Sequence, residues 1–378
     1  MEIYLDSAAT TKPCEAAISA CFYAMAENYG NPSSLHGLGI KAENAVTEAR
    51  KAVAAGLVCD PGCITFTSGA TESNNTVILG AAERYAKRKK KVVISAVEHP
   101  SVAQPVKYLE EHGFTVVRVK PDRTGAVDAD DFINAVDDNT FLASCMFVNN
   151  ETGAVMPVRK IFSAVKKRYP ECVTHCDAVQ GFMKLPIRAA DSPVDFMTVS
   201  AHKIHGVKGV GALYSKKGVR IPPHVYGGGQ EKGMRSGTES VPLIAAFGAA
   251  VRTVMPTMQS AYENAEALSG YLTKQLEGLG YVDINSTAEN RCPYIINFSV
   301  KGIRSEIMLH FLESREIYVS SGSACSKGAH SSVLEAMGLS AENADSAIRV
   351  SLCRTTTKGE LDLLLRGISD GYSQLAKR

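Results

Sequence analysis

The chain has almost no net charge, because its 378 residues include 41 lysines and arginines and 39 aspartates and glutamates. A formal charge of +2 provides no strong field to attract nucleic acid or a membrane surface. We identify no apolar run of the roughly 18 residues that a membrane-spanning helix needs, and residues 1–6 do not resemble a signal peptide. We therefore expect a cytoplasmic protein with no membrane partner and no direct nucleic-acid partner.

The ten cysteines lack the dense, regular spacing of a disulfide framework. Two tight clusters occur, Cys59 with Cys63 and Cys172 with His175 and Cys176, and neither has paired CxxC spacing. Cys172 and Cys176 fall in a predicted strand, where small buried side chains are a better interpretation than zinc ligands. We expect free thiols in a reducing compartment and no metal site.

Short apolar runs alternate with helical patterns through the first two thirds of the chain. This alternation predicts an α/β fold with a mostly parallel seven-stranded sheet and helices on both faces. The expected strands are residues 64–67, 92–95, 115–119, 141–148, 172–176, 194–199 and 211–214.

A long helical pattern between residues 243 and 279 is interrupted by Pro256, which must end or kink a helix. We place a domain boundary there, with a large domain at residues 14–255. Residues 1–13, an extended arm, and residues 256–378 then form a smaller α+β domain. Its expected elements are strands at 294–300 and near 318–319, and helices at 305–313 and 358–375.

Lys203 follows the predicted strand at 194–199, in a segment that contains Ser200, His202 and several glycines. Ligands of open α/β sheets bind beyond the carboxyl ends of the strands. A lysine at that edge is a candidate Schiff-base residue, although a plain polar loop explains this segment equally well. A free lysine with a pKa of about 10.4 is only about one part in a thousand neutral near neutral pH, so it needs burial or a cofactor to react.

Other strands bring polar residues to the same edge. Residues 67–75 join a strand to a helix and could cradle a phosphate, or could simply cap the helix. His99 could stack on an aromatic ligand, and Asp177 could hold a pyridinium nitrogen protonated. Asn150 could bind a ligand or simply stabilise a turn. Together with Lys203, these residues describe a pyridoxal phosphate site.

A set of short motifs is distributed along nearly the whole chain, at residues 67–73, 98–99, 148–151, 177–180, 200–203, 235–238 and 320–325. Together these motifs resemble a known family, the NifS/IscS-like cysteine desulfurases of the class V aminotransferase group. The set is far more specific than any one of its motifs.

The resemblance implies a fold-type I pyridoxal phosphate homodimer that takes sulfur from L-cysteine, releases L-alanine and leaves a persulfide on a protein cysteine. It implies Lys203, Cys325 and His99 as catalytic residues, and Asn31, Asn150 and Arg349 as substrate-binding residues. Thr238 would reach the phosphate of the neighbouring subunit. The implied cofactor-binding residues are Ala70, Thr71, His99, Asn150, Asp177, Gln180, Ser200, His202, Lys203 and Thr238.

Cys325 separates this reaction from related ones. It lies among small residues that cannot pack, so we expect an exposed and poorly ordered loop, in which Lys327 or His99 could favour the thiolate. Two departures from the family pattern stand out: Val207 replaces a frequent proline, and the segment from Cys325 to Leu339 looks short. The short segment leaves the sulfur-acceptor protein undetermined.

Other functions share most of these residues. A selenocysteine lyase or another class V aminotransferase would keep every cofactor residue, and only Cys325 and its loop argue against them. A catalytically inactive sulfur-relay or scaffold protein is disfavoured by the intact Lys203, and no G-x-G-x-x-G motif supports a dinucleotide enzyme. Iron–sulfur cluster assembly, tRNA thiolation and thiamine synthesis would all use the same sulfur chemistry.

Overall fold

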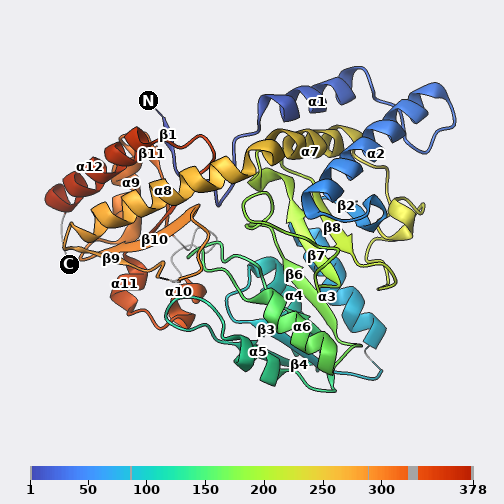
Figure 1. Ribbon diagram of the computed structural model, residues 1–378, viewed down its shortest axis with the longest axis horizontal. Coiled ribbons are helices and arrows are strands. Elements are labelled where there is room, and N and C mark those ends of the chain that lie inside the picture. Colours follow the sequence, from blue (N-terminus) through green and yellow to red (C-terminus); the bar gives the residue numbers. More distant parts are fainter. Residues whose placement is uncertain (1, 86, 288, 322–330, 376–378) are drawn as a thin grey trace.

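The computed structural model describes residues 2–85, 87–287, 289–321 and 331–375. Its centre is a seven-stranded sheet with the order β2-β8-β7-β6-β5-β3-β4 (Figure 1). β8 runs antiparallel to both of its neighbours, and all the other pairs are parallel. The strands are β2 (Ile64–Thr67), β3 (Lys91–Ser95), β4 (Thr115–Val119), β5 (Thr140–Ser144), β6 (Val173–Asp177), β7 (Phe196–Ser200) and β8 (Gly211–Ser215).

Helices cover both faces of this sheet, as the alternating sequence pattern predicts. α3 (Ala70–Tyr85) and α4 (Pro100–Glu111) pack on one face, where Ile78, Phe141 and Phe196 are fully buried. The helices on the other face are α2 (Gly37–Leu57), α5 (Ala129–Ala135), α6 (Val158–Arg168) and α7 (Val241–Val254). α1 (Glu15–Ala26) packs on the outside of α7. The prediction of a mostly parallel α/β fold is confirmed.

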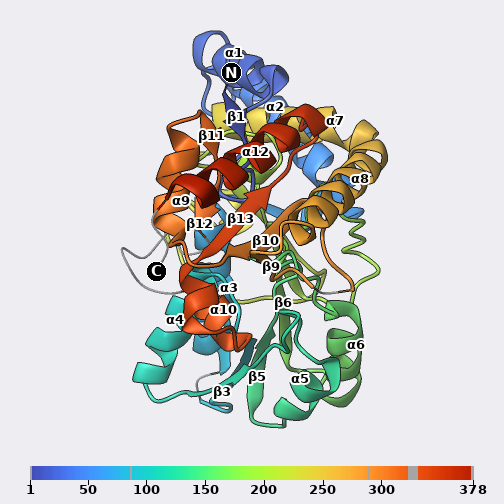
Figure 2. The same ribbon diagram turned by 90° about the vertical axis from the view of Figure 1, so that its left-hand side faces the viewer.

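The second body of the fold is a four-stranded antiparallel sheet with the order β12-β13-β10-β9. Figure 2 shows its strands near the middle height of the molecule, with α12 above them. Its strands are β9 (Val282–Ile284), β10 (Ile295–Val300), β12 (Ser320–Ser321) and β13 (Ala347–Ser351). Its helices are α8 (Met258–Glu277), α9 (Ser305–Glu313), α10 (Ser332–Ala336), α11 (Ala341–Asp345) and α12 (Lys358–Gln374). The exact division into two domains stays a prediction.

One long helical stretch joins the two bodies, as the pattern at 243–279 predicts. α7 and α8 are separated by the short 3₁₀ turn η4 (Met255–Thr257), which contains Pro256. The stretch Val241–Glu277 includes an 18-residue window of mean hydropathy 1.4, half of it buried inside the structure. The expectation that no apolar span of this length exists was therefore wrong. The window is apolar because α7 packs between the sheet and α1.

The N-terminal segment crosses between the two bodies. β1 (Ile3–Tyr4) pairs in parallel with β11 (Ile317–Tyr318) in the smaller body. A few residues later, the N–H of Thr11 donates to the carbonyl of His202 (2.8 Å) in the larger one. The segment between these two anchors therefore passes directly beside Lys203.

Candidate active site

Lys203 ends the 3₁₀ turn η2 (Ala201–Lys203), which follows β7 at its carboxyl end. Its Nζ donates to the carbonyls of Ala8 (2.6 Å) and Ala9 (2.7 Å) in the crossing segment. Burial, followed by the nearby cations Lys184 and Arg349, lowers the pKa of Lys203 from 10.5 to about 7. A substantial fraction of the amine is therefore neutral near pH 7, which is the nucleophilic form.

The crossing segment is held against the lysine turn by the side chain of Thr11. Its hydroxyl donates to the carbonyl of His202 (2.9 Å) and accepts the N–H of His205 (2.7 Å). His202 Nδ1 lies 3.2 Å from the hydroxyl of Thr10. Burial, and next the charge of Lys203, lowers the pKa of His202 to about 4, so this imidazole is neutral at pH 7. Residues 8–11 therefore line the site beside Lys203, a role that no pattern in the sequence indicated.

Asp177 ends β6 and is buried, with both carboxylate oxygens oriented by the chain. Oδ1 accepts the N–H of Val179 (3.0 Å), and Oδ2 accepts Asn74 Nδ2 (2.8 Å). Asn74 also donates to the hydroxyl of Ser101 (2.8 Å), and that hydroxyl lies 2.8 Å from His99 Nδ1. This network connects Asp177 to His99 through two side chains that sequence reasoning missed.

Asn74 could have been found from helical periodicity. It lies on the same face of α3 as Val77, Ile78 and Ala81, all of which are buried. An asparagine on such a face must have a polar partner within the fold. Its Oδ1 has no hydrogen-bond partner among the described residues.

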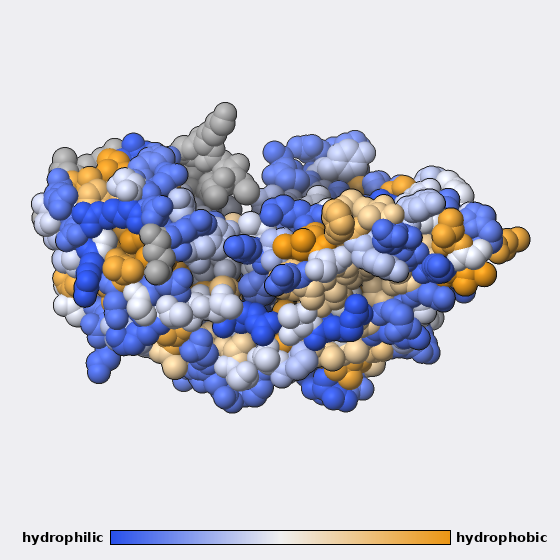
Figure 3. Space-filling view, turned by 90° about the horizontal axis from the view of Figure 1, so that it is seen from above, coloured by the Kyte–Doolittle hydropathy of each residue, from blue (hydrophilic) through white to orange (hydrophobic). Residues whose placement is uncertain are grey.

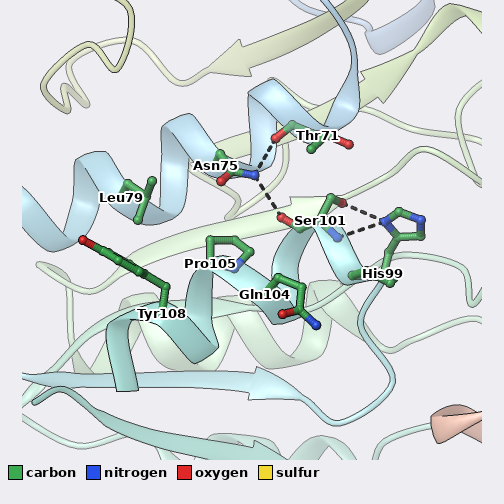
Figure 4. A pocket seen from close by; sticks show the side chains of 9 residues that line it. Thr71, Asn75, Leu79, His99, Ser101, Gln104, Pro105 and Tyr108 are labelled. Atoms are coloured by element: carbon green, nitrogen blue, oxygen red, sulfur yellow. Dashed lines mark hydrogen bonds between the residues drawn. The ribbon is translucent and has the colours of Figure 1, made fainter. Parts of the chain in front are cut away.

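His99 is the N-cap of α4, and its Nδ1 accepts the N–H of Ser101 (3.1 Å). In the neutral ring the proton is therefore on Nε2. Burial is the main cause of a lowered pKa for His99, with the positive charge of Lys203 acting in the same direction and Asp177 opposing both. His99 borders a hollow of about 570 Å³ between α3 and α4, which Thr71 and Tyr108 also line (Figure 4).

The first turn of α3 presents main-chain donors toward this region. The N–H groups of Ala70 and Thr71 have no acceptor among the described residues. The loop before the helix packs tightly on β8, since a Cβ on Gly211 would lie only 2.8 Å from the carbonyl carbon of Gly69. Ser200 is buried opposite Gly211 in the sheet register. Free N–H groups at a helix start suit a phosphate.

Arg349 enters the site from β13 in the smaller body. Its guanidinium donates to Asp6 Oδ1 (2.7 Å) and to the carbonyl of Asn150 (3.0 Å). Its Nε is buried and has no partner among the described residues. An arginine with a free donor in a buried site can bind a carboxylate. The structure thus brings Arg349 and Asn150 together, as the resemblance implied.

Gln180 lies in the turn after β6, and its Nε2 donates to the carbonyl of Ala8 (2.9 Å). That carbonyl also accepts Lys203, so the structure brings these two predicted residues together. Asn31 and Thr238 are different, because both are exposed and no contact joins either one to the residues around Lys203. Asn31 Oδ1 instead accepts the N–H of Ser33 (2.9 Å). The predictions for Cys325 and its loop lie outside the described residues.

The loop that carries Thr238 is anchored to the large sheet by buried Glu231. This carboxylate accepts two donors of Arg50 (2.7 and 2.8 Å) and the N–H of Phe66 (3.0 Å). Arg235 in the same loop pairs with Glu72 in the first turn of α3 (2.9 Å). The loop is therefore held firmly while Thr238 points to solvent.

The described residues fit pyridoxal phosphate. Free N–H groups and hydroxyls suit its phosphate, Asp177 suits its ring nitrogen, neutral His99 suits its ring face, and Lys203 suits its aldehyde. No group of three or more histidine, cysteine, aspartate or glutamate residues able to hold a metal occurs in the part of the chain that the structure describes.

Comparisons with known proteins agree with this fit. The family model described as "Aminotransferase class-V" matches residues 3–364. A "Cysteine desulfurase IscS" of Dictyoglomus turgidum is 38% identical, over 96% of this chain and 93% of its own length. A solved NifS-like protein superposes with a TM-score of 0.94 at 38% identity, covering 99% of this chain and all of its own. Another, "SspA in complex with cysteine", gives a TM-score of 0.83 at 32% identity, covering 94% of this chain and 100% of its own.

Proposed function

This chain belongs to the class-V aminotransferase family, and we propose that it is a pyridoxal phosphate-dependent cysteine desulfurase. In this reaction L-cysteine and a protein thiol yield L-alanine and a protein persulfide, so the sulfur atom moves between two molecules and no other reagent is consumed. The similarity to a named cysteine desulfurase and to a structure with bound cysteine supports this choice within the family.

The observation that carries the proposal is the environment of Lys203. Its amine is held at the carboxyl edge of the sheet by two main-chain carbonyls, and its pKa is lowered to about 7, mainly by burial. When bound, pyridoxal phosphate supplies an electron sink that weakens bonds in the attached amino acid. A buried, partly neutral lysine is what attachment of such a cofactor requires.

The remaining residues position the cofactor and the substrate. Ala70, Thr71, Ser200 and His202 would hold the phosphate, while Asp177 and Gln180 would hold the ring. Neutral His99 would stack on the ring and transfer a proton at Nε2, because its Nδ1 is engaged by the N–H of Ser101. Arg349 would bind the substrate carboxylate with its unpartnered Nε, beside Asn150.

Cys325 would accept the sulfur. An ordinary thiol with a pKa of about 8.5 is only about a tenth thiolate near neutral pH, so a nearby cation would raise its reactivity. The persulfide would then pass to a thiol of an acceptor protein, such as an iron–sulfur scaffold or a tRNA-thiolation enzyme. A reducing, cytoplasmic setting suits this chemistry, and the nine described cysteines are all free thiols.

We also propose that the chain acts as a homodimer. Figure 3 shows apolar side chains gathered at the end of the molecule formed by α1 and the following loop. Exposed apolar patches of this kind mark contact surfaces. The exposed apolar residues there are Ile18, Phe22, Tyr23, Met25, Tyr29, Leu35, Leu38 and Ile40. In such a dimer, the exposed residues Asn31 and Thr238 could contribute to the active site of the partner subunit.

Replacing the proposed sulfur acceptor tests the reaction. With L-cysteine and a reducing thiol, the unmodified chain should release sulfide and alanine in equal amounts. Cys325→Ser should keep the yellow cofactor colour and release no sulfide, whereas Cys59→Ser, a control outside the site, should behave as the unmodified chain. Undiminished sulfide from Cys325→Ser would refute the assignment.

The same assay separates the alternatives. A selenocysteine lyase would release little sulfide from L-cysteine but would release selenide from L-selenocysteine. An aminotransferase would consume L-cysteine only with a keto-acid acceptor. An inactive scaffold would show neither reaction.

A further inference from the structure

Lys184 is a second buried lysine beside the site, and none of the roles assigned so far includes it. It lies in the turn after β6 and is only 7% exposed. Across the described residues it forms no ion pair with a carboxylate. Its Nζ donates to Gln180 Oε1 (3.0 Å) and lies 5.9 Å from the centre of the Tyr294 ring. Buried lysines are rare unless they are paired with an acid, so this one needs an explanation.

A chain of hydrogen bonds links Lys184 to Lys203. Lys184 donates to Gln180 Oε1, and Gln180 Nε2 donates to the Ala8 carbonyl (2.9 Å). The same carbonyl accepts Lys203 Nζ (2.6 Å). Because Lys184 has only donors, it fixes which end of the Gln180 amide faces Ala8. Gln180 in turn holds the carbonyl that orients the Lys203 amine.

The two lysines also act on each other through their charges. Two ammonium groups in one buried region disfavour each other's charged form. Lys184 is the largest cause after burial of the lowered pKa of Lys203. Burial lowers the pKa of Lys184 itself. The other groups that face this pair are the cation Arg349, the acids Asp6 and Asp177, and the thiols Cys292 and Cys353.

We propose that Lys184 is a positioning residue that keeps the Lys203 amine neutral and aimed for cofactor attachment, through Gln180 and the Ala8 carbonyl. The proposal rests on the cofactor chemistry proposed above and adds the group that prepares the lysine for it. It also explains why a lysine occupies a buried position where a purely structural role would favour an apolar side chain.

The test measures the protonation of Lys203 directly. The full-length chain, freed of cofactor, is treated with trace acetic anhydride across a pH series, and acetylation of Lys203 is quantified by peptide mass spectrometry. Lys184→Met should raise the midpoint for Lys203 by about one pH unit, so that the neutral fraction of the amine at pH 7 falls about fivefold, from about a half to about a tenth. Lys184→Arg should keep the midpoint low, and Lys51→Met, at an exposed site on α2, should leave it unchanged.

Lys184→Gln keeps a polar side chain beside Gln180 and provides a second neutral variant if the methionine variant does not fold. Either neutral variant with an unchanged midpoint would overturn the proposal, as would an arginine variant that shifts as far as the neutral ones. The labelling needs neither L-cysteine nor turnover. A failed desulfurase assay therefore does not affect the labelling result. An unchanged midpoint would likewise leave the proposed desulfurase activity standing.

Discussion

The two ends of the central sheet use buried charge in opposite ways. At the amino end of β6 and β7, Lys166 pairs with buried Asp195 (2.7 Å), and this carboxylate also accepts the N–H of Thr174 (3.0 Å). At the carboxyl end, Lys203 and Lys184 have no carboxylate partner among the described residues, and Arg349 Nε has no partner there at all. We call the amino end complete, because its buried charges are paired within the chain, and the carboxyl end incomplete, because some of its charged groups are not.

The difference shows where a ligand is needed. Buried polar groups in folded proteins are normally satisfied, so groups left unsatisfied at one edge indicate something the chain alone does not supply. Substitutions at the complete end should lower stability and spare activity, whereas substitutions at the incomplete end should lower activity and can raise stability. Each of the following predictions tests that difference between the two ends.

The largest effect is expected from Lys203→Met. Removing the amine should lower the rate of alanine formation at least about a thousandfold, because the proposed point of cofactor attachment is lost. Steady-state kinetics with L-cysteine measure this loss. A residual rate within tenfold of the unmodified chain would mean that another residue attaches the cofactor.

The same variant should be more stable than the unmodified chain when both are freed of cofactor. The pKa of Lys203 is about 7 in the folded chain and about 10.5 when unperturbed, so the folded chain binds fewer protons between these pH values. The loss of stability caused by burying the charged Lys203 amine is therefore present in full below pH 7 and disappears as pH rises toward 10.5. Denaturant unfolding should show an advantage on the order of 5 kcal/mol at low pH that shrinks with rising pH. An advantage that does not vary with pH would contradict the lowered pKa.

Asp195→Ala should have the next largest effect, and on stability alone. It leaves Lys166 without its carboxylate partner, which should lower the free energy of unfolding by about 3 kcal/mol. Activity per folded molecule, measured after thermal unfolding has been checked, should stay within about twofold. A large loss of kcat here would remove the distinction between the two ends.

Arg349→Gln should have the smallest of these effects. Loss of the charged donor should raise KM for L-cysteine by about 10 to 100-fold, the equivalent of a charge-assisted hydrogen bond of about 1.5–3 kcal/mol. Stability should fall less than in Asp195→Ala, because glutamine keeps a donor for Asp6, whereas alanine at 195 leaves both Lys166 and the N–H of Thr174 without their acceptor. A change in kcat without a change in KM would place Arg349 outside substrate binding.

The fold was largely predictable because its strands are short buried apolar runs. β2 and β4 match the expected residues fully, and most other boundaries differ by one or two positions. The expected strand at 141–148 was too long, because the regular strand ends at Ser144, although the N–H of Phe147 still donates to the carbonyl of Asp177 (2.8 Å). β13, which carries Arg349, was missed as a strand. The antiparallel direction of β8 depends on long-range pairing that no local pattern encodes.

The site was predictable where a residue lies at or shortly after the end of a strand, as Asp177 and Lys203 do. It was not predictable where a main-chain group acts, because the carbonyl of Ala8 has no sequence signature. Lys184 was missed for a related reason, since a lysine in a turn normally implies solvent exposure. Only its burial in the folded chain shows otherwise.

Borohydride reduction of the cofactor-loaded chain, followed by peptide mass spectrometry, shows directly which residue attaches the cofactor. We expect one pyridoxyl phosphate group per chain, attached to Lys203. Attachment to Lys184, or to no lysine, would contradict this expectation.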